Sequence, residues 1–163
     1  MSFLIDSWKQ QHQSADKLNK QLLRRLKLRT PKNLGEIAGE LHEEIFTELD
    51  CLDCANCCKS IPPLLNETDI RRLAKTLGLK VSAFHERYVR IDEDGDRVIA
   101  STPCPFLDAD NKCLVYESRP KACRQYPHTD RAQFAENLKL HHLNTKVCPA
   151  VYHILQRLQN VYD

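Results

Sequence analysis

Residues 51–58 read Cys51-Leu52-Asp53-Cys54-Ala55-Asn56-Cys57-Cys58 and place four thiols within eight residues of the chain. Four more cysteines follow singly, and these are Cys104, Cys113, Cys123 and Cys148. A single buried cysteine is ordinary, but eight thiols in 163 residues at this spacing indicate metal ligands. Eight thiols make two sets of four, so we predict that the protein coordinates iron or zinc through all eight cysteines.

The spacing of the first four cysteines bears on which metal they hold. A C-x-x-C pair closes a tight turn, but Cys54 belongs to two overlapping pairs, which excludes two independent zinc knuckles. Cys51, Cys54 and Cys57 instead form a tripod that suits three corners of an iron–sulfur cube, with a distant cysteine closing the fourth. Zinc stays open, because two zinc ions bridged through Cys57 and Cys58 fit the spacing equally well.

The four distal cysteines have local surroundings that favour a thiolate. Cys148 immediately precedes Pro149 at the start of a predicted helix, where free N–H groups stabilise negative charge. Cys104 also precedes a proline, which holds its backbone extended. Cys123 lies in the first turns of a short helix beside Arg124.

Cysteine usage also bears on the compartment. Residues 1–10 lack the long apolar centre of a signal peptide, and no apolar run is long enough to span a bilayer. We therefore expect a cytoplasmic protein that does not associate with a membrane. Disulfides are reduced in the cytoplasm, which makes a disulfide framework the weaker interpretation of these cysteines.

Two further alternatives concern single side chains. Cys58 beside Lys59 is a candidate nucleophile, because the tripod needs only three of the first four thiols, but no histidine has a sequence context that ties it to Cys58. His128, His141 and His142 flank the distal cysteines and could replace a thiolate. With eight thiols in the chain, they are not needed as ligands.

On the N-terminal side of the cysteine cluster, the sequence predicts two helices. Residues 1–30 read as one helix, ended by Pro31, and Asn33 then caps a second helix. The apolar face of the first helix contains Leu18, Leu22 and Leu26. Because the first helix is basic and the second acidic, we expect residues 1–49 to form an antiparallel helical hairpin that packs on the core. The acidic helix cancels the basic field, so nucleic acid is not expected as a partner.

On the other side, residues 50–163 are predicted to form the eight-cysteine domain. Asn66 and Asp69 resemble the capping pair of a helix, and residues 88–92 and 97–101 read as a β-hairpin. Prolines mark two further helix starts, at Pro120 and Pro149. The predicted fold is mainly α with a small β-hairpin, a metal-centred cysteine-rich domain preceded by a helical hairpin.

The cysteine pattern resembles a known family. The segment Cys51 to Cys58, then Cys104-Pro105-Phe106-Leu107, then Cys113-Leu114-Val115-Tyr116-Glu117-x-Arg119-Pro120-x-x-Cys123-Arg124-x-Tyr126-Pro127 and a late Cys148 are similar to the CxxCxxCC proteins, also called YkgJ-like cysteine-cluster proteins. The resemblance implies zinc or iron chelation. Flagellin lysine methylases have a similar cysteine domain, which makes an enzymatic role conceivable. We expect Arg119 or Arg124 to donate hydrogen bonds to the cluster thiolates.

Three functions are consistent with these observations. The first is an iron–sulfur protein in electron transfer, or a part of an oxidoreductase or modification system with a protein or redox partner. The second is a structural zinc protein that acts as an interaction module or adaptor without catalysis. The third is a stand-alone enzyme such as a methyltransferase. It is the weakest, because the four glycines leave little room for a glycine-rich cofactor loop and no residue is assigned to catalysis.

Overall fold

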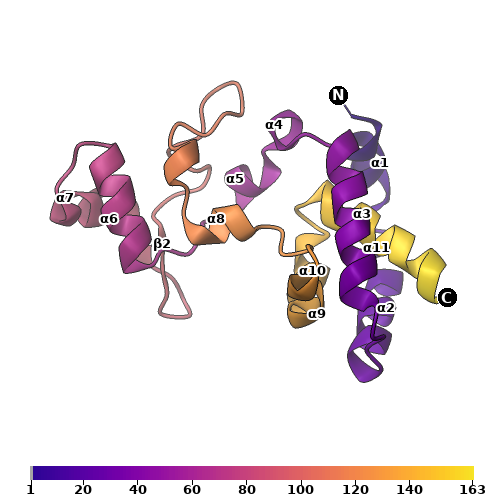
Figure 1. Ribbon diagram of the computed structural model, residues 1–163. Coiled ribbons are helices and arrows are strands. Elements are labelled where there is room, and N and C mark those ends of the chain that lie inside the picture. The colour runs from indigo at the N-terminus through magenta and orange to yellow at the C-terminus, as the bar shows by residue number, and fades with distance from the viewer. Residues whose placement is uncertain (1) are drawn as a thin grey trace. The chain divides into compact units, whose positions relative to one another are not determined.

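The computed structural model describes residues 2–163, coloured by residue number in Figure 1. The fold is mainly α with one two-stranded antiparallel sheet, as the sequence predicts. Two compact units divide the chain, which we call unit 1 (Met1–Cys54 and Pro127–Asp163) and unit 2 (Ala55–Tyr126). In residues 2–163, no helix combines the length and apolarity that crossing a membrane requires.

Unit 1 is a group of helices around the C-terminal helix. Its elements are α1 (Phe3–Gln11), α2 (Asp16–Leu28), α3 (Leu34–Glu48), α4 (Cys51–Cys54), α9 (Ala132–Glu136), α10 (Leu138–Asn144) and α11 (Pro149–Tyr162). Helix α11 packs on α1, α2 and α3. Its apolar stripe is buried at Val151, Ile154, Leu155 and Leu158, whereas Val161 near the end of the helix is exposed. Burial of this stripe therefore joins the two ends of the chain.

The predicted single helix over residues 1–30 is wrong, because the chain breaks between α1 and α2. The break lets Trp8 pack with Ala15 and Tyr152, and the Trp8 indole Nε1–H donates to the Thr145 carbonyl at 2.7 Å. Of the predicted apolar face, Leu22 and Leu26 are buried but Leu18 is exposed. Tertiary packing on the C-terminal helices overrides the continuous helical pattern.

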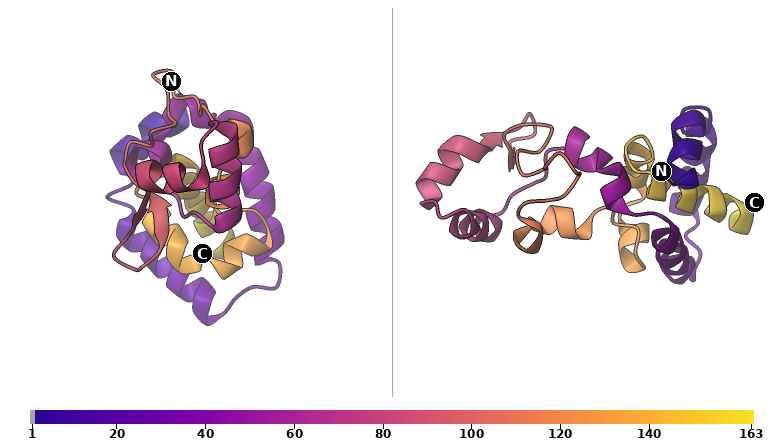
Figure 2. Two further views of the ribbon diagram at one scale, coloured as in Figure 1. Left: turned by 90° about the vertical axis from the view of Figure 1, so that its left-hand side faces the viewer. Right: turned by 90° about the horizontal axis from the view of Figure 1, so that it is seen from above.

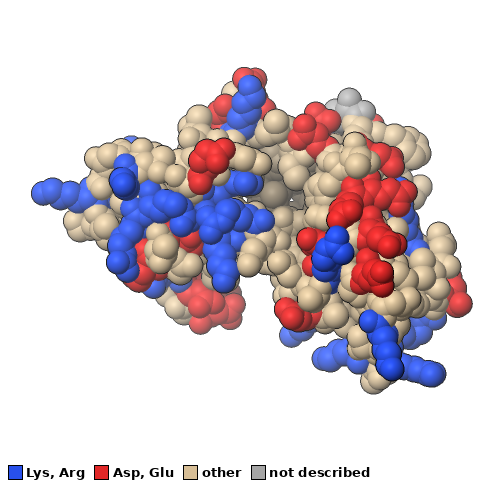
Figure 3. Space-filling model, in the orientation of Figure 1, with Lys and Arg blue, Asp and Glu red and all other residues tan. Residues whose placement is uncertain are grey.

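The acidic and basic helices find other charge partners than the sequence suggests. Acidic side chains line the visible face of α3 (Figure 3). Glu44 and Glu48 pair with Arg157 on α11, while Glu43 pairs with Arg131. The compact units likewise differ from the predicted boundary after residue 49, since the C-terminal helices share one core with the N-terminal ones.

Unit 1 contains a buried histidine that makes its stability depend on pH. His141 is fully buried, its Nε2 lies 2.9 Å from the Phe134 carbonyl, and burial lowers its pKa from 6.5 to about 4. The unfolded chain therefore takes up a proton as the pH falls below 6.5, before the folded chain does. We expect the free energy of unfolding to drop between pH 6.5 and 4, by up to about 3 kcal/mol. Denaturant titrations should show a smaller drop for His141→Gln, and an equal drop in both proteins would contradict this assignment.

Unit 2 combines a helix pair with a short hairpin and a long irregular segment. Its elements are α5 (Asn56–Ser60), α6 (Glu67–Thr76), α7 (Val81–Tyr88), β1 (Val89–Ile91), β2 (Arg97–Ile99), the 3-10 helix η1 (Tyr116–Ser118) and α8 (Lys121–Gln125). Helix α6 packs beside α7 (Figure 2). The predicted capping box of Asn66 and Asp69 and the predicted β-hairpin, with Val89 opposite Ile99, are both confirmed.

The core of unit 2 is small. Its buried apolar residues are Leu65, Ile70, Leu73, Ala74, Phe84, Ile99, Phe106 and Val115, with Cys104 and Cys113 packed against them. Residues 100–115 contain no helix or strand longer than an isolated bridge. A unit of this size needs further cross-links to hold such a segment.

Candidate metal centre

Four of the cysteines in unit 2 come from three separate segments. Cys58 is on α5, Cys104 and Cys113 lie on the irregular segment, and Cys123 is on α8. The Cys104 N–H donates to the Cys58 carbonyl at 2.8 Å, which ties the irregular segment to α5. An isolated bridge between Leu107 and Cys113 then folds the segment back on itself. Local hydrogen bonds thus bring Cys58, Cys104 and Cys113 to one side of the small core.

The fourth thiol, that of Cys123, lies close enough to the other three for their charges to act on it. Burial and then the charge of Cys58 raise the pKa of Cys104, and the same two causes act on Cys123, whose pKa reaches about 12. The pKa of Cys113 is also raised, first by burial. Cys58 differs, because a hydrogen bond from the Cys57 side chain lowers its pKa to about 7. Thiolates at these four positions repel one another, and a bound cation would remove that penalty.

Arg119 supplies positive charge to this group. It lowers the pKa of Cys58, Cys113 and Cys123, although in each case another cause is larger. Its guanidinium carbon lies 3.6 Å from the centre of the Tyr116 ring, and its Nε donates to the Tyr116 carbonyl at 2.8 Å. Instead of the expected thiolates, Arg119 donates to the Tyr116 carbonyl and Arg124 to the Arg119 carbonyl, so Arg119 acts on the thiols through its charge.

Three further cysteines gather in unit 1. Cys51 and Cys54 are the ends of α4, three residues apart and therefore on one face of the turn. Cys148 is the N-cap of α11, and the backbone N–H groups of Val151 and Ala150 favour its thiolate. Burial outweighs them and, with the charges of Cys51 and Cys54, raises the pKa of Cys148 to about 12. The start of α11 thus lowers the pKa of Cys148, as the sequence indicates, but burial has the larger effect and favours the protonated thiol.

The structure groups the cysteines as Cys58, Cys104, Cys113 and Cys123 in unit 2 and Cys51, Cys54 and Cys148 in unit 1. The Cys57 side chain hydrogen-bonds to Cys58. The tripod of Cys51, Cys54 and Cys57 stays a prediction. All eight cysteines are free thiols. As the side chains stand, no group of three or more Cys, His, Asp or Glu residues within residues 2–163 has the geometry to hold a metal ion.

The histidines near the distal cysteines have other partners. His141 Nε2 lies 2.9 Å from the Phe134 carbonyl, and His142 Nε2 lies 3.0 Å from Asp16 Oδ1. His128 has a hydrogen bond with the Gln133 side chain. The donor set that best fits a metal is therefore the thiols, whose chemistry suits zinc, iron or an iron–sulfur cluster. When bound, the metal would supply a charge that four thiolates neutralise and a set of bonds that joins their segments.

Comparison with known families agrees with this donor set. Residues 50–149, more than half of the chain, match the CxxCxxCC family model, described as "Putative zinc- or iron-chelating domain". The chain belongs to the CxxCxxCC family. Its CxxCxxCC domain contains all eight cysteines and spans parts of both units. No curated protein and no solved structure matches the chain.

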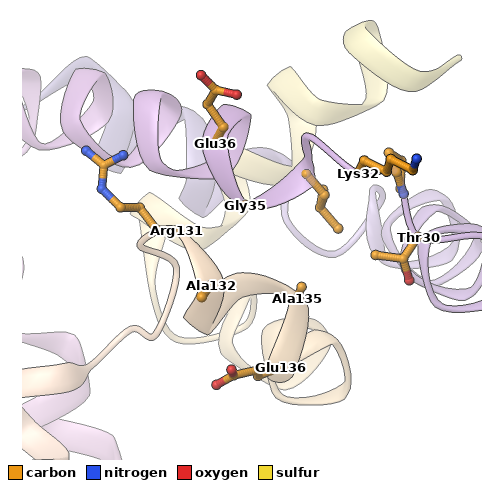
Figure 4. A pocket seen from close by; sticks show the side chains of 10 residues that line it. Thr30, Lys32, Gly35, Glu36, Arg131, Ala132, Ala135 and Glu136 are labelled. Atoms are coloured by element: carbon orange, nitrogen blue, oxygen red, sulfur yellow. The ribbon is translucent and has the colours of Figure 1, made fainter.

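Unit 1 also contains a hollow of about 620 Å³, and none of the residues that line it is a cysteine. Arg131 and Glu36 lie at one end of it and Lys32 and Thr30 at the other (Figure 4). Arg131 approaches α3 closely, because a Cβ on Gly39 would lie 2.8 Å from Arg131 Cγ. No local sequence pattern marks Arg131, because its partners on α3 lie far from it in the sequence.

Proposed function

We propose that this CxxCxxCC protein binds its metal in unit 2 through the thiolates of Cys58, Cys104, Cys113 and Cys123. The observation that carries the proposal is that three segments bring four thiols to one small apolar core, close enough for their charges to act on one another. Two thiolates from the irregular segment and one each from α5 and α8 suit a closed site of four sulfurs, the arrangement typical of structural metals. The metal would then act as the cross-link that the irregular segment lacks.

The role that follows is that of an interaction module whose folded surface depends on its metal. Lys and Arg side chains gather over α6 and over α8, the helix that contains Cys123, on the visible face of unit 2 (Figure 3). Positive charge there offsets the charge of four thiolates and is available to a protein partner. We propose a reducing compartment, the cytoplasm, because eight cysteines at this spacing are better explained as metal ligands than as disulfides.

An iron–sulfur centre for electron transfer is the second candidate. The charge of Arg119 acts on three of the four thiols, and positive charge near cluster sulfurs raises a reduction potential. The two candidates differ in metal and colour. A cluster absorbs visible light through sulfur-to-iron charge transfer, whereas zinc has a full d shell and is colourless.

Elemental analysis tests the proposal. Protein expressed in cells supplied with both metals and purified without oxygen should contain zinc or iron at one equivalent or more. A colourless zinc protein that turns blue-green with cobalt supports the interaction module, and a brown iron protein supports electron transfer. Folded protein that contains neither metal and gains no cobalt spectrum would refute the proposed function.

A further inference from the structure

A buried carboxylate joins α6 to the start of α8. Asp69 is only 2% exposed, although carboxylates are rarely buried without partners. Its Oδ2 accepts the Asn66 N–H at 3.2 Å, which completes the capping box of α6. Its Oδ1 accepts from Arg72 Nη2 at 2.7 Å and from the Lys121 N–H at 3.1 Å. The second oxygen thus caps the helix that carries Cys123, although 52 residues separate the two partners.

Arg72 extends this link to the backbone just before α8. Its Nη2 also donates to the Arg119 carbonyl at 2.8 Å, and its Nε donates to the Ser118 carbonyl at 3.3 Å. One planar guanidinium therefore contacts a carboxylate and two successive carbonyls, which the single ammonium of a lysine cannot reproduce. At the edge of the same contact, Thr76 Oγ1 lies 2.6 Å from Ser118 Oγ.

The backbone that Asp69 and Arg72 hold, residues 118–121, includes Arg119 and leads directly into Cys123. Arg119, whose charge acts on Cys58, Cys113 and Cys123, supplies one of the two carbonyls and lies two residues before the capped Lys121. Cys123 follows Lys121 by two residues on the same short helix. A displacement of residues 118–121 would move a ligand thiol and its nearby cation together.

We infer that Asp69 and Arg72 are positioning residues of the unit 2 metal site, holding residues 118–121 so that Arg119 and Cys123 face the other thiols. The inference rests on the proposed function, because it concerns a metal held at those thiols. A purely structural pair would stabilise α6 and the fold without changing how the bound metal is coordinated. A spectroscopic signature of the metal therefore separates the two roles.

The test compares Arg72→Lys with Arg71→Lys in the full chain loaded with cobalt. Arg71 is the neighbouring arginine of α6, but its Nε donates only to the Glu67 carbonyl within its own helix, at 3.4 Å. We expect Arg72→Lys to weaken cobalt binding by about 10- to 100-fold, the usual cost of losing an outer-sphere partner. Its ligand-field bands should also shift in position or intensity. Arg71→Lys should leave the affinity and the bands unchanged.

The outcomes separate this inference from the proposed function. Wild-type protein that gives no thiolate-cobalt spectrum refutes the proposed function and this inference with it. A wild-type spectrum that Arg72→Lys reproduces with unchanged affinity overturns the inference alone, even if the thermal midpoint falls. Should Arg72→Lys lose its helical circular dichroism, Asp69→Asn replaces it, because the amide keeps the shape and an acceptor but removes the charge. An unchanged affinity in Asp69→Asn would then overturn the inference.

Discussion

Removing the metal is expected to unfold unit 2 and to leave most of unit 1 helical. The four thiols of unit 2 join α5, the irregular segment and α8, and structural zinc contributes on the order of 10 kcal/mol of binding free energy. That is as large as the whole stability of a typical domain. Unit 1 has its own apolar core, built from α11 against α1, α2 and α3. Circular dichroism during titration with a strong chelator should therefore show a partial loss of helix.

Thermal unfolding with and without chelator completes this test. The metal-free protein should lose the cooperative transition of unit 2, and added zinc or iron should restore it. Hydrogen exchange locates the effect, since amides of α6 should lose protection while those of α11 keep it. A thermal midpoint that does not change on complete metal removal would contradict a structural role for the metal.

Much of the fold was accessible from local sequence signals. The capping box at Asn66, the hairpin and the start of α11 at Pro149 each depend on residues within a few positions of one another. The sequence does not predict the break before α2. The break allows Trp8 to contact Thr145, the C-cap of α10, which lies 137 residues away in the sequence. Helix periodicity cannot report such a contact.

For the candidate site too, the sequence predicts part of the outcome and the rest depends on tertiary structure. The spacing and number of the cysteines indicated metal binding and the CxxCxxCC family, and the family match confirms that part. The grouping of the thiols was out of reach, since Cys148 gathers with Cys51 and Cys54 only through the packing of the chain's two ends in unit 1. The capping role of Asp69 could be predicted, whereas its bond to Lys121 needed the tertiary structure.

Substituting single cysteines should divide them into ligands and neighbours, with Cys123→Ser and Cys57→Ser as the informative pair. Both changes replace sulfur by oxygen and alter the chain equally little in size. Cys123 is one of four thiols in the proposed site, so its loss should weaken metal binding by more than about 100-fold, beyond the cost of losing an outer-sphere partner. Its charge interacts with those of Cys58, Cys104 and Cys113.

Cys57 should behave differently, because its side chain hydrogen-bonds to Cys58. A serine hydroxyl can still donate to the Cys58 sulfur, so Cys57→Ser should weaken binding by about tenfold or less. Competition with a chromophoric chelator measures both affinities, and visible absorption shows whether iron or cobalt keeps its thiolate bands. An iron–sulfur cube on Cys51, Cys54 and Cys57 predicts the reverse ranking, since Cys57 would then hold one corner. Equal and large losses for both variants would mean that Cys57 is itself a ligand, and the four-thiolate assignment in unit 2 would have to be abandoned.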